Sequence, residues 1–302
     1  MAINMEKTAK RRLPGGYNGA DAAIYAFHIA AAAICLAPLI NIIAISFSES
    51  SAAVSGVVNF LPVRFTLASY NKIMEEGSYL RSFFISIVRV LSGTGLTMFL
   101  MVLMAYPLSK SDAEFRQRKF FIWMIVITML FYGGLIPTYL TVVYLGLKNT
   151  LWALILPCAV QSYNTILMMN FFRTIPKELT EAAEIDGAHD WYILFRIFLP
   201  ISLPALATLG LFVIVYHWNE YFSGLIYMDS PQNYPLQTYI YSLSIKINFE
   251  QLSAEEIVER AKIGTLTFNA AKIVISMIPV LCVYPFLQRY FVKGLVLGSV
   301  KG

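Results

Sequence analysis

The chain has 302 residues, of which 58% are hydrophobic and only 14% are charged, so it has too few charged side chains to cover a water-soluble globule of this size. This composition excludes an ordinary soluble domain and indicates a protein that folds in a membrane. The net charge of +5 can indicate contact with nucleic acid, but in a membrane protein the basic residues must first be compared with membrane orientation.

Six stretches of the chain are long and apolar enough to cross a hydrocarbon core of about 30 Å as helices. In chain order they cover residues 22–47, 83–107, 120–144, 151–172, 203–222 and 273–291. The first stretch follows a basic cluster, but its apolar run is too long for a cleavable signal peptide, so we expect it to remain as an anchor. The sequence predicts an all-α, polytopic membrane protein with six transmembrane helices.

The positions of the basic residues predict how these helices are oriented. With the amino terminus in the cytoplasm, fourteen lysines and arginines fall on the cytoplasmic side and seven on the outer side. This asymmetry is typical of membrane proteins and accounts for the basicity without nucleic acid. Both termini are then cytoplasmic. The expected parts are a cytoplasmic tail at 1–21, a transmembrane domain at 22–302, a cytoplasmic loop at about 174–200, and outer loops at about 48–82 and 223–272.

The second outer loop contains a segment with its own helical pattern. Ser253 and Glu256 have the spacing of a capping box, and the residues that follow, up to Lys262, form a short amphipathic helix in this interpretation. It is either a solvated loop helix or a contact for another protein.

Helix breakers recur inside the apolar stretches. In lipid, a broken helix persists only where neighbouring helices or a watery cavity satisfy its freed backbone groups. The breakers therefore predict helices packed around a path, although kinks without such a role are the alternative. They are Gly93, Gly95, Gly133, Gly134, Pro137, Pro157, Pro279 and Pro285.

Few residues could carry enzymatic chemistry. The three histidines, His28, His189 and His217, are spread over two apolar stretches and a loop, so we expect no shared metal site and no catalytic triad. No phosphate-binding loop of the Gly-x-x-x-x-Gly-Lys-[Ser/Thr] type occurs. We therefore expect no enzyme, no catalytic residues and no bound cofactor, and any energy for work must come from a partner.

Polar side chains inside the apolar stretches are better candidates for function. Arg89 lies six residues after Phe83, so it either extends to the outer interface or has a role inside the bilayer. Aromatic rings and amide groups suit a sugar-sized solute, which offers ring faces and hydroxyls. An interfacial aromatic belt explains the aromatic members almost as well. The candidates for contact with such a solute are Asn164, Met168, Trp218, Asn219 and Tyr221.

Residues 174–200 interrupt the apolar pattern with a charged stretch that is rich in Ala and Gly. Pro176 suits the first turn of a helix, and Gly187 can take the left-handed conformation that ends one. Asp190 can then cap a second helix that leads into the fifth apolar stretch. The pattern predicts a short helix, a tight turn and a second helix.

The first of these predicted helices has two different faces. Lys177 and Glu181 have the i,i+4 spacing of an ion pair. One flank of the helix is acidic, and the side chains on the opposite face are small enough for another protein to approach closely. A generic amphipathic linker at the membrane surface would also have this pattern. The acidic residues are Glu178, Glu181 and Glu184, and the apolar ones are Leu179, Ala182 and Ala183.

A longer pattern within this stretch carries a resemblance. Glu181-Ala182-Ala183 is followed after three residues by Gly187, and after nine more by Ile197-x-Leu199-Pro200. This pattern resembles the EAA loop of the inner-membrane permease subunits of ABC importers. Further stretches resemble the carbohydrate uptake type 1, or maltose-type, permeases, and residues 234–241 resemble the branch that serves oligosaccharide importers with lipoprotein receptors. These further stretches are 136–157, 170–188 and 218–221.

The resemblance implies a type I ABC importer permease in a bacterial cell membrane, with a sugar or oligosaccharide as cargo. It also implies a second homologous permease subunit, two ATPase subunits that use ATP and Mg, and an extracellular solute-binding lipoprotein. The first helix of the loop would dock on the ATPase as a coupling helix. Its coupling residues would be Glu181, Ala182, Ala183, Asp186 and Gly187.

Two alternatives remain beside a sugar importer. The same kind of importer could carry a peptide or an amino acid. An ion-coupled secondary transporter needs carboxylates inside its spans, and here only Glu220, at the outer end of the fifth stretch, qualifies.

Overall fold

The computed structural model describes residues 19–75, 77–245 and 265–299. Over these residues the chain forms helices joined by loops, with no β-strand. The predicted helix from Ser253 to Lys262 lies outside the described residues. The all-α fold class is confirmed.

Three helices are each long and apolar enough to cross a membrane, and three bent pairs of helices pass the same test. Six spans result if each bent pair crosses once. The three helices are α1 (Gly19–Ser46), α4 (Gly77–Ser109) and α16 (Thr265–Ser299). The pairs are α5 (Arg118–Leu130) with α6 (Leu135–Tyr144), α7 (Leu151–Ile155) and η1 (Leu156–Cys158) with α8 (Ser162–Phe172), and α10 (Asp190–Ile193), η2 (Leu194–Phe198) and α11 (Leu199–Ile201) with α12 (Leu203–Asn219).

The bend in the third predicted span is much larger than a kink. Helices α5 and α6 meet at 113°. Gly134 precedes α6 with a φ of +93°, a conformation that glycine adopts without a side-chain clash. Helix α5 has 13 residues and a length of about 20 Å, which is shorter than the hydrocarbon core of about 30 Å. The breakers Gly133 and Gly134 therefore divide this stretch into two separate helices.

Other predicted breakers do not break their helices. Helix α4 runs through Gly93 and Gly95 without interruption, and α16 runs through Pro279 and Pro285. Gly93 has a different use, because the ring of His217 on α12 lies directly against it. These residues do not interrupt their helices, and Gly93 lets two spans approach closely.

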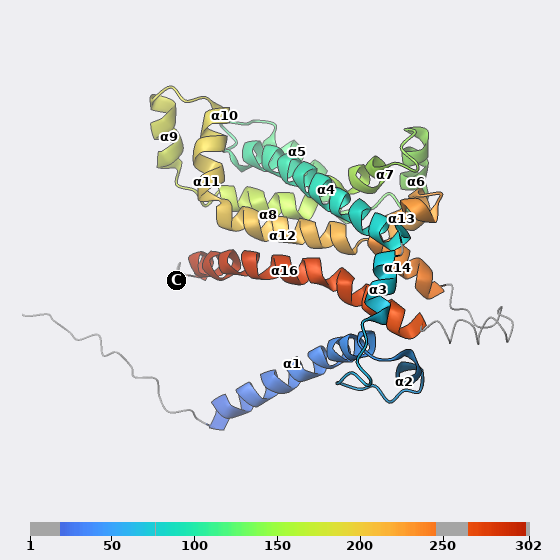
Figure 1. The fold of residues 1–302 in the computed structure, drawn as a ribbon. Coiled ribbons are helices and arrows are strands. Elements are labelled where there is room, and N and C mark those ends of the chain that lie inside the picture. The colour runs from blue at the N-terminus through green and yellow to red at the C-terminus, as the bar shows by residue number, and fades with distance from the viewer. Residues whose placement is uncertain (1–18, 76, 246–264, 300–302) are drawn as a thin grey trace, which may run out of the picture.

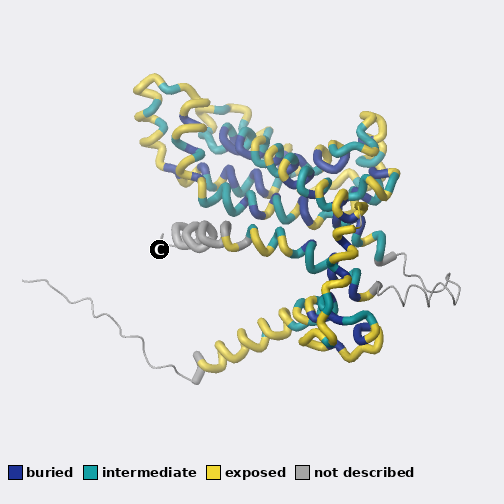
Figure 2. Tube along the Cα trace, in the orientation of Figure 1, coloured by how far each residue is buried: buried dark blue, intermediate teal, exposed yellow. Residues whose placement is uncertain are grey.

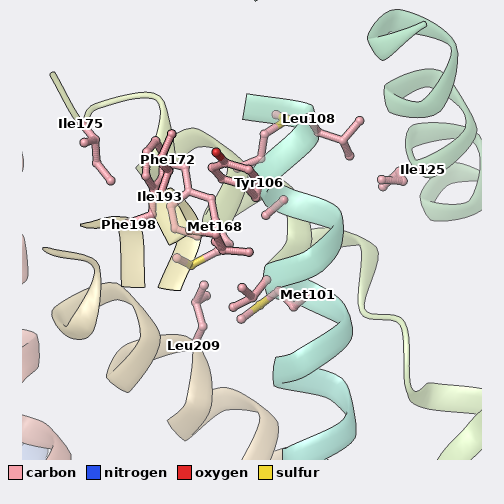
Figure 3. Packing of buried hydrophobic residues seen from close by; sticks show 14 residues of the cluster. Met101, Tyr106, Leu108, Ile125, Met168, Phe172, Ile175, Ile193, Phe198 and Leu209 are labelled. Carbon is pink, nitrogen blue, oxygen red and sulfur yellow. The ribbon is translucent and has the colours of Figure 1, made fainter. Parts of the chain in front are cut away.

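Helices α4, α8, α12 and α16 pack alongside one another, and α1 contacts α16 at one end and then diverges from the other helices (Figure 1). Much of α1 is exposed along its length (Figure 2). One apolar cluster joins α4, α8, α10 and α12 (Figure 3). A second cluster joins α4, α12 and α16 with α3 (Ala68–Glu75) and α14 (Leu236–Ile245).

The two ends of the bundle differ in which segments they carry. At one end lie α9 (Lys177–Ile185), the start of α1 and the end of α16 (Figure 1). We call this the coupling-loop end. The opposite end carries α2 (Ser50–Val54), α3, α6, α13 (Phe222–Tyr227) and α14 (Figure 1). The described parts of the two predicted outer loops thus lie at one end of the bundle, and the predicted coupling loop lies at the other.

Replacing Gly93 with alanine is expected to lower the free energy of unfolding by about 1–2 kcal/mol, in the lower part of the usual range for overpacking a core. The added Cβ would lie 2.7 Å from Cε1 of His217, a ring that is itself buried. Thermal unfolding of the detergent-purified chain measures the effect. Gly95→Ala is the control, because its Cβ would meet nothing within 4 Å and alanine favours the helix. Equal melting temperatures for the two variants would contradict this account of the contact.

Candidate functional site

Helix α9 ends in a hydrogen-bonded turn that requires glycine. The amide of Ala188 donates to the carbonyl oxygen of Ala183 at 2.9 Å, and the amide of Gly187 donates to that of Glu184 at 3.0 Å. This pair of bonds is the Schellman motif, and Gly187 takes the positive φ of +80° that the motif needs. The conformation predicted for Gly187 is confirmed. It fixes the direction in which the chain leaves α9 toward α10.

The exposed surface of α9 is apolar at its centre and acidic at its edge. Ile185 is 87% exposed, Ala182 is also exposed, and Glu181 and Asp186 lie in solvent beside them. Ala183 does not share this face, because it packs against the apolar cluster of α4, α8 and α10. Ala183 anchors α9 to the bundle, and its coupling role stays a prediction. What remains exposed is a surface that a second protein can cover.

Asp190 binds α4 and does not cap α10. Its carboxylate accepts a hydrogen bond from the Tyr106 hydroxyl at 3.2 Å and forms an ion pair with Lys110. His189 occupies the cap position. The Lys110 ammonium holds the pKa of the Asp190 carboxyl below its usual range, so this contact is present at neutral pH and is lost as the pH falls through that lowered pKa. Asp190 therefore ties the coupling loop to the end of α4.

A pocket of about 300 Å³ lies between α9 and the loop that joins α4 to α5. Both signs of charge line it, so it does not select a simple anion. No ion pair joins Lys177 to Glu181, although their spacing predicted one, and both residues line the pocket. The charged residues in its wall are Lys110, Glu114, Arg118, Arg173, Lys177, Glu181 and Glu184.

Three of the five predicted solute-contact residues are enclosed by protein. Met168 is 0% exposed in the cluster between α4 and α12 (Figure 3). Trp218 is buried, and its indole nitrogen donates to the carbonyl oxygen of Ser276 at 3.1 Å. Asn164 is buried and donates to the Gln161 side chain at 2.5 Å. In this conformation these three side chains pack inside the protein, and their contact with a solute stays a prediction.

Asn219 and Tyr221 are accessible at the end of α12. Asn219 is exposed, and Tyr221 is 38% exposed with its ring 4.4 Å from the ring of Tyr241. Glu220, between them, has extended backbone and separates α12 from α13. An amide and a pair of aromatic rings thus gather at a helix break, as a sugar contact requires. These two residues also stay as predicted contacts.

The Arg89 side chain lies inside the protein and not at its surface. It is 1% exposed and forms an ion pair with Glu220, 131 residues later in the chain. Sequence reasoning considered the two residues separately and missed the pair. The only available signal was that each is an isolated charge in an apolar stretch, and opposite charges inside a membrane protein tend to pair.

Comparisons with known proteins show the family of this chain. The family model of the binding-protein-dependent transport system inner membrane component matches residues 77–296. The polygalacturonan/rhamnogalacturonan transport system permease protein YtcP of Bacillus subtilis (strain 168) is 42% identical over 282 residues, covering 93% of this chain and 98% of that protein. Protein LplC of the same strain is 38% identical, with 89% and 90% covered.

A solved structure shows the same fold. A chain of the bacterial ABC transporter involved in the import of the acidic polysaccharide alginate superposes with a TM-score of 0.81 at 31% identity, covering 91% of this chain and 99% of that one. The helices of this chain thus follow a known architecture. With the family match over residues 77–296, the chain is a member of the binding-protein-dependent transport system inner membrane components, the permease subunits of ABC importers, and not an enzyme.

Proposed function

We propose that this chain forms half of the translocation path of an ATP-driven importer for a sugar or oligosaccharide. The observation that carries the proposal is the coupling loop: α9 ends in a glycine-dependent turn, is anchored through Ala183 and Asp190, and presents Ile185 to solvent. Such a rigid, exposed element suits the transmission of force from a partner. A polysaccharide is the cargo in the names of one close relative and of the matched structure, which supports a sugar cargo here.

The proposed assembly supplies what this chain lacks. A second homologous permease completes the path, two ATPase subunits that use ATP and Mg dock on the coupling loops, and an extracellular lipoprotein delivers the solute. The coupling-loop end then faces the cytoplasm of a bacterial cell, and with it both termini. Residues 1–21 form the cytoplasmic tail of a transmembrane domain at 22–302, whose loop at about 174–200 contacts the ATPase. The outer loops at about 48–82 and 223–272 lie on the side that receives the binding protein.

Reconstitution tests the proposed function. The chain alone in liposomes is expected neither to hydrolyse ATP nor to transport, because it has no phosphate-binding loop and only half of a path. With its partner permease, ATPase and binding protein, it is expected to import a labelled oligosaccharide only when ATP is present.

Three results would contradict this function. ATP hydrolysis by the pure chain would make it an enzyme. Uptake driven by an ion gradient without ATP would make it a secondary transporter. Uptake of peptides or amino acids in place of sugars would keep the importer and change its cargo.

A further inference from the structure

The guanidinium of Arg89 binds two backbone carbonyl groups as well as a carboxylate. One of its terminal nitrogens donates to the carbonyl oxygen of Glu220 at 2.7 Å. The other donates to the carbonyl oxygen of Leu154 at 3.3 Å and to the Ser223 hydroxyl at 3.1 Å, and it forms the ion pair with the Glu220 carboxylate. Four acceptors from three separate segments thus converge on one side chain of α4.

Both carbonyl groups belong to helices that end inside the bundle. Leu154 lies in the last turn of α7, and Glu220 is the residue after α12. The last carbonyls of a helix have no partner within it, and in a protein interior each must find a donor elsewhere. Helix carboxyl ends also carry a partial negative charge, which a cation stabilises. Arg89 therefore supplies hydrogen-bond donors to the carbonyl groups at two helix ends.

The same contacts fix the break between α12 and α13. The amide of Ser223, near the start of α13, donates to the Glu220 carboxylate at 2.8 Å, and the Ser223 hydroxyl binds that carboxylate as well. On the other side, the carbonyl oxygen of Tyr221 accepts a hydrogen bond from Thr238 at 2.7 Å. Glu220 is held from α4 while Tyr221 is held from α14. The exposed residues on either side of the break thus have defined positions.

We propose that Arg89 is a positioning residue of the translocation path, which sets the place of Asn219 and Tyr221 by holding the α12–α13 break against the end of α7. This inference rests on the proposed function. A lysine cannot replace Arg89, because an ammonium is a point charge that lacks the planar fork reaching both carbonyls and the carboxylate. The role thus depends on the geometry of the guanidinium and not on charge alone.

The test compares Arg89→Lys with Arg81→Lys in the assembled importer. Arg81 is on the same helix, but it is exposed, and among the described residues its side chain donates to the Asn233 side chain at 3.1 Å. We expect Arg89→Lys to assemble and to lower the maximal uptake rate at least about tenfold. The concentration of loaded binding protein at half-maximal uptake should change by less than about twofold, because the variant replaces no residue of the outer loops. Arg81→Lys should match the parent.

A thiol reporter separates positioning from a general structural defect. The native cysteines Cys35, Cys158 and Cys282 are replaced by alanine, and Asn219→Cys adds a single thiol at the break. With a membrane-impermeant maleimide, Arg89→Lys is expected to change the labelling rate at this thiol by at least about threefold, whereas Arg81→Lys leaves it unchanged.

Two outcomes would overturn the proposal. One is parent-like uptake by Arg89→Lys, and the other is lost uptake with an unchanged labelling rate at position 219. If Arg89→Lys does not assemble, Glu220→Gln decides by the same two measurements, because it removes the carboxylate but keeps the backbone carbonyl. The parent complex separates this proposal from the proposed function. A parent complex that imports no sugar refutes the function. A parent that imports sugar, with variants that match it in uptake and labelling, refutes only the role of Arg89.

Discussion

Gly187→Val is expected to lower ATP-dependent sugar uptake at least about tenfold, which corresponds to a loss of coupling free energy of about 1–2 kcal/mol. A β-branched residue at φ +80° is strained, and opening the turn that ends α9 relieves this strain at the lowest cost in free energy. Opening it breaks the bonds from Gly187 to Glu184 and from Ala188 to Ala183, so that α9 leaves its anchored position. The measurements are uptake, stimulated ATP hydrolysis and co-purification of the ATPase.

Gly146→Val is a matched control for Gly187→Val. Gly146 also has a positive φ, +67°, and an added Cβ would meet nothing within 4 Å at either glycine, so the two variants carry the same kind of strain. Gly146 follows α6 at the opposite end of the bundle, away from the coupling loop. We expect the Gly146→Val variant to co-purify with the ATPase. Loss of the ATPase in both variants would attribute the effect to general instability, and retention in both with normal uptake would refute the coupling role of this turn.

Gly224→Ala is expected to lower the free energy of unfolding by about 3 kcal/mol, at the upper end of the usual cost of overpacking. The added Cβ would lie 2.1 Å from the hydroxyl oxygen of Thr238 and less than 3 Å from its other side-chain carbons. Thr238 is completely buried, and its hydroxyl donates to the carbonyl oxygen of Tyr221. No rotation of this β-branched side chain clears all three contacts, so α13 and α14 must move apart.

Thermal unfolding of the purified subunit measures the Gly224→Ala effect, and Gly77→Ala serves as its control because the new Cβ there meets nothing within 4 Å. Moving Thr238 also displaces Tyr221, whose carbonyl oxygen it binds, so uptake is expected to fall as well. A melting temperature equal to that of Gly77→Ala would show that the contact between α13 and α14 is not tight in solution.

Much of the fold was predictable from apolar runs and turn residues. The positions of α1, α4, α8, α12 and α16 follow from the length of each apolar stretch, and the end of α9 follows from Gly187. The bend angles were not predictable, because a glycine or proline permits a break but its neighbours in space decide whether one forms. Gly133 and Gly134 mark a break, whereas Gly93 receives the His217 ring within an unbroken helix.

The site was predictable where its pattern is local and not where it depends on packing. The capping of α9 is a local pattern, so Gly187 was found. The face of a short helix that is buried depends on the rest of the bundle, so the inward position of Ala183 was missed. The pairing of Arg89 with Glu220 spans 131 residues and follows no sequence period. Met168 and Trp218 have residue types suited to a solute contact, but the same types fill cores.

The shortness of α5 has a consequence for how the chain enters the membrane. A helix of about 20 Å is shorter than the hydrocarbon core of the bilayer. Such a mismatch is relieved when the bilayer thins or when the helix associates with other helices. In the folded protein α5 packs against α4, which is synthesised before it, and α8, which is synthesised after it. We therefore expect α5 to be retained only once α8 has left the ribosome, so that residues 118–172 integrate as one unit and not span by span.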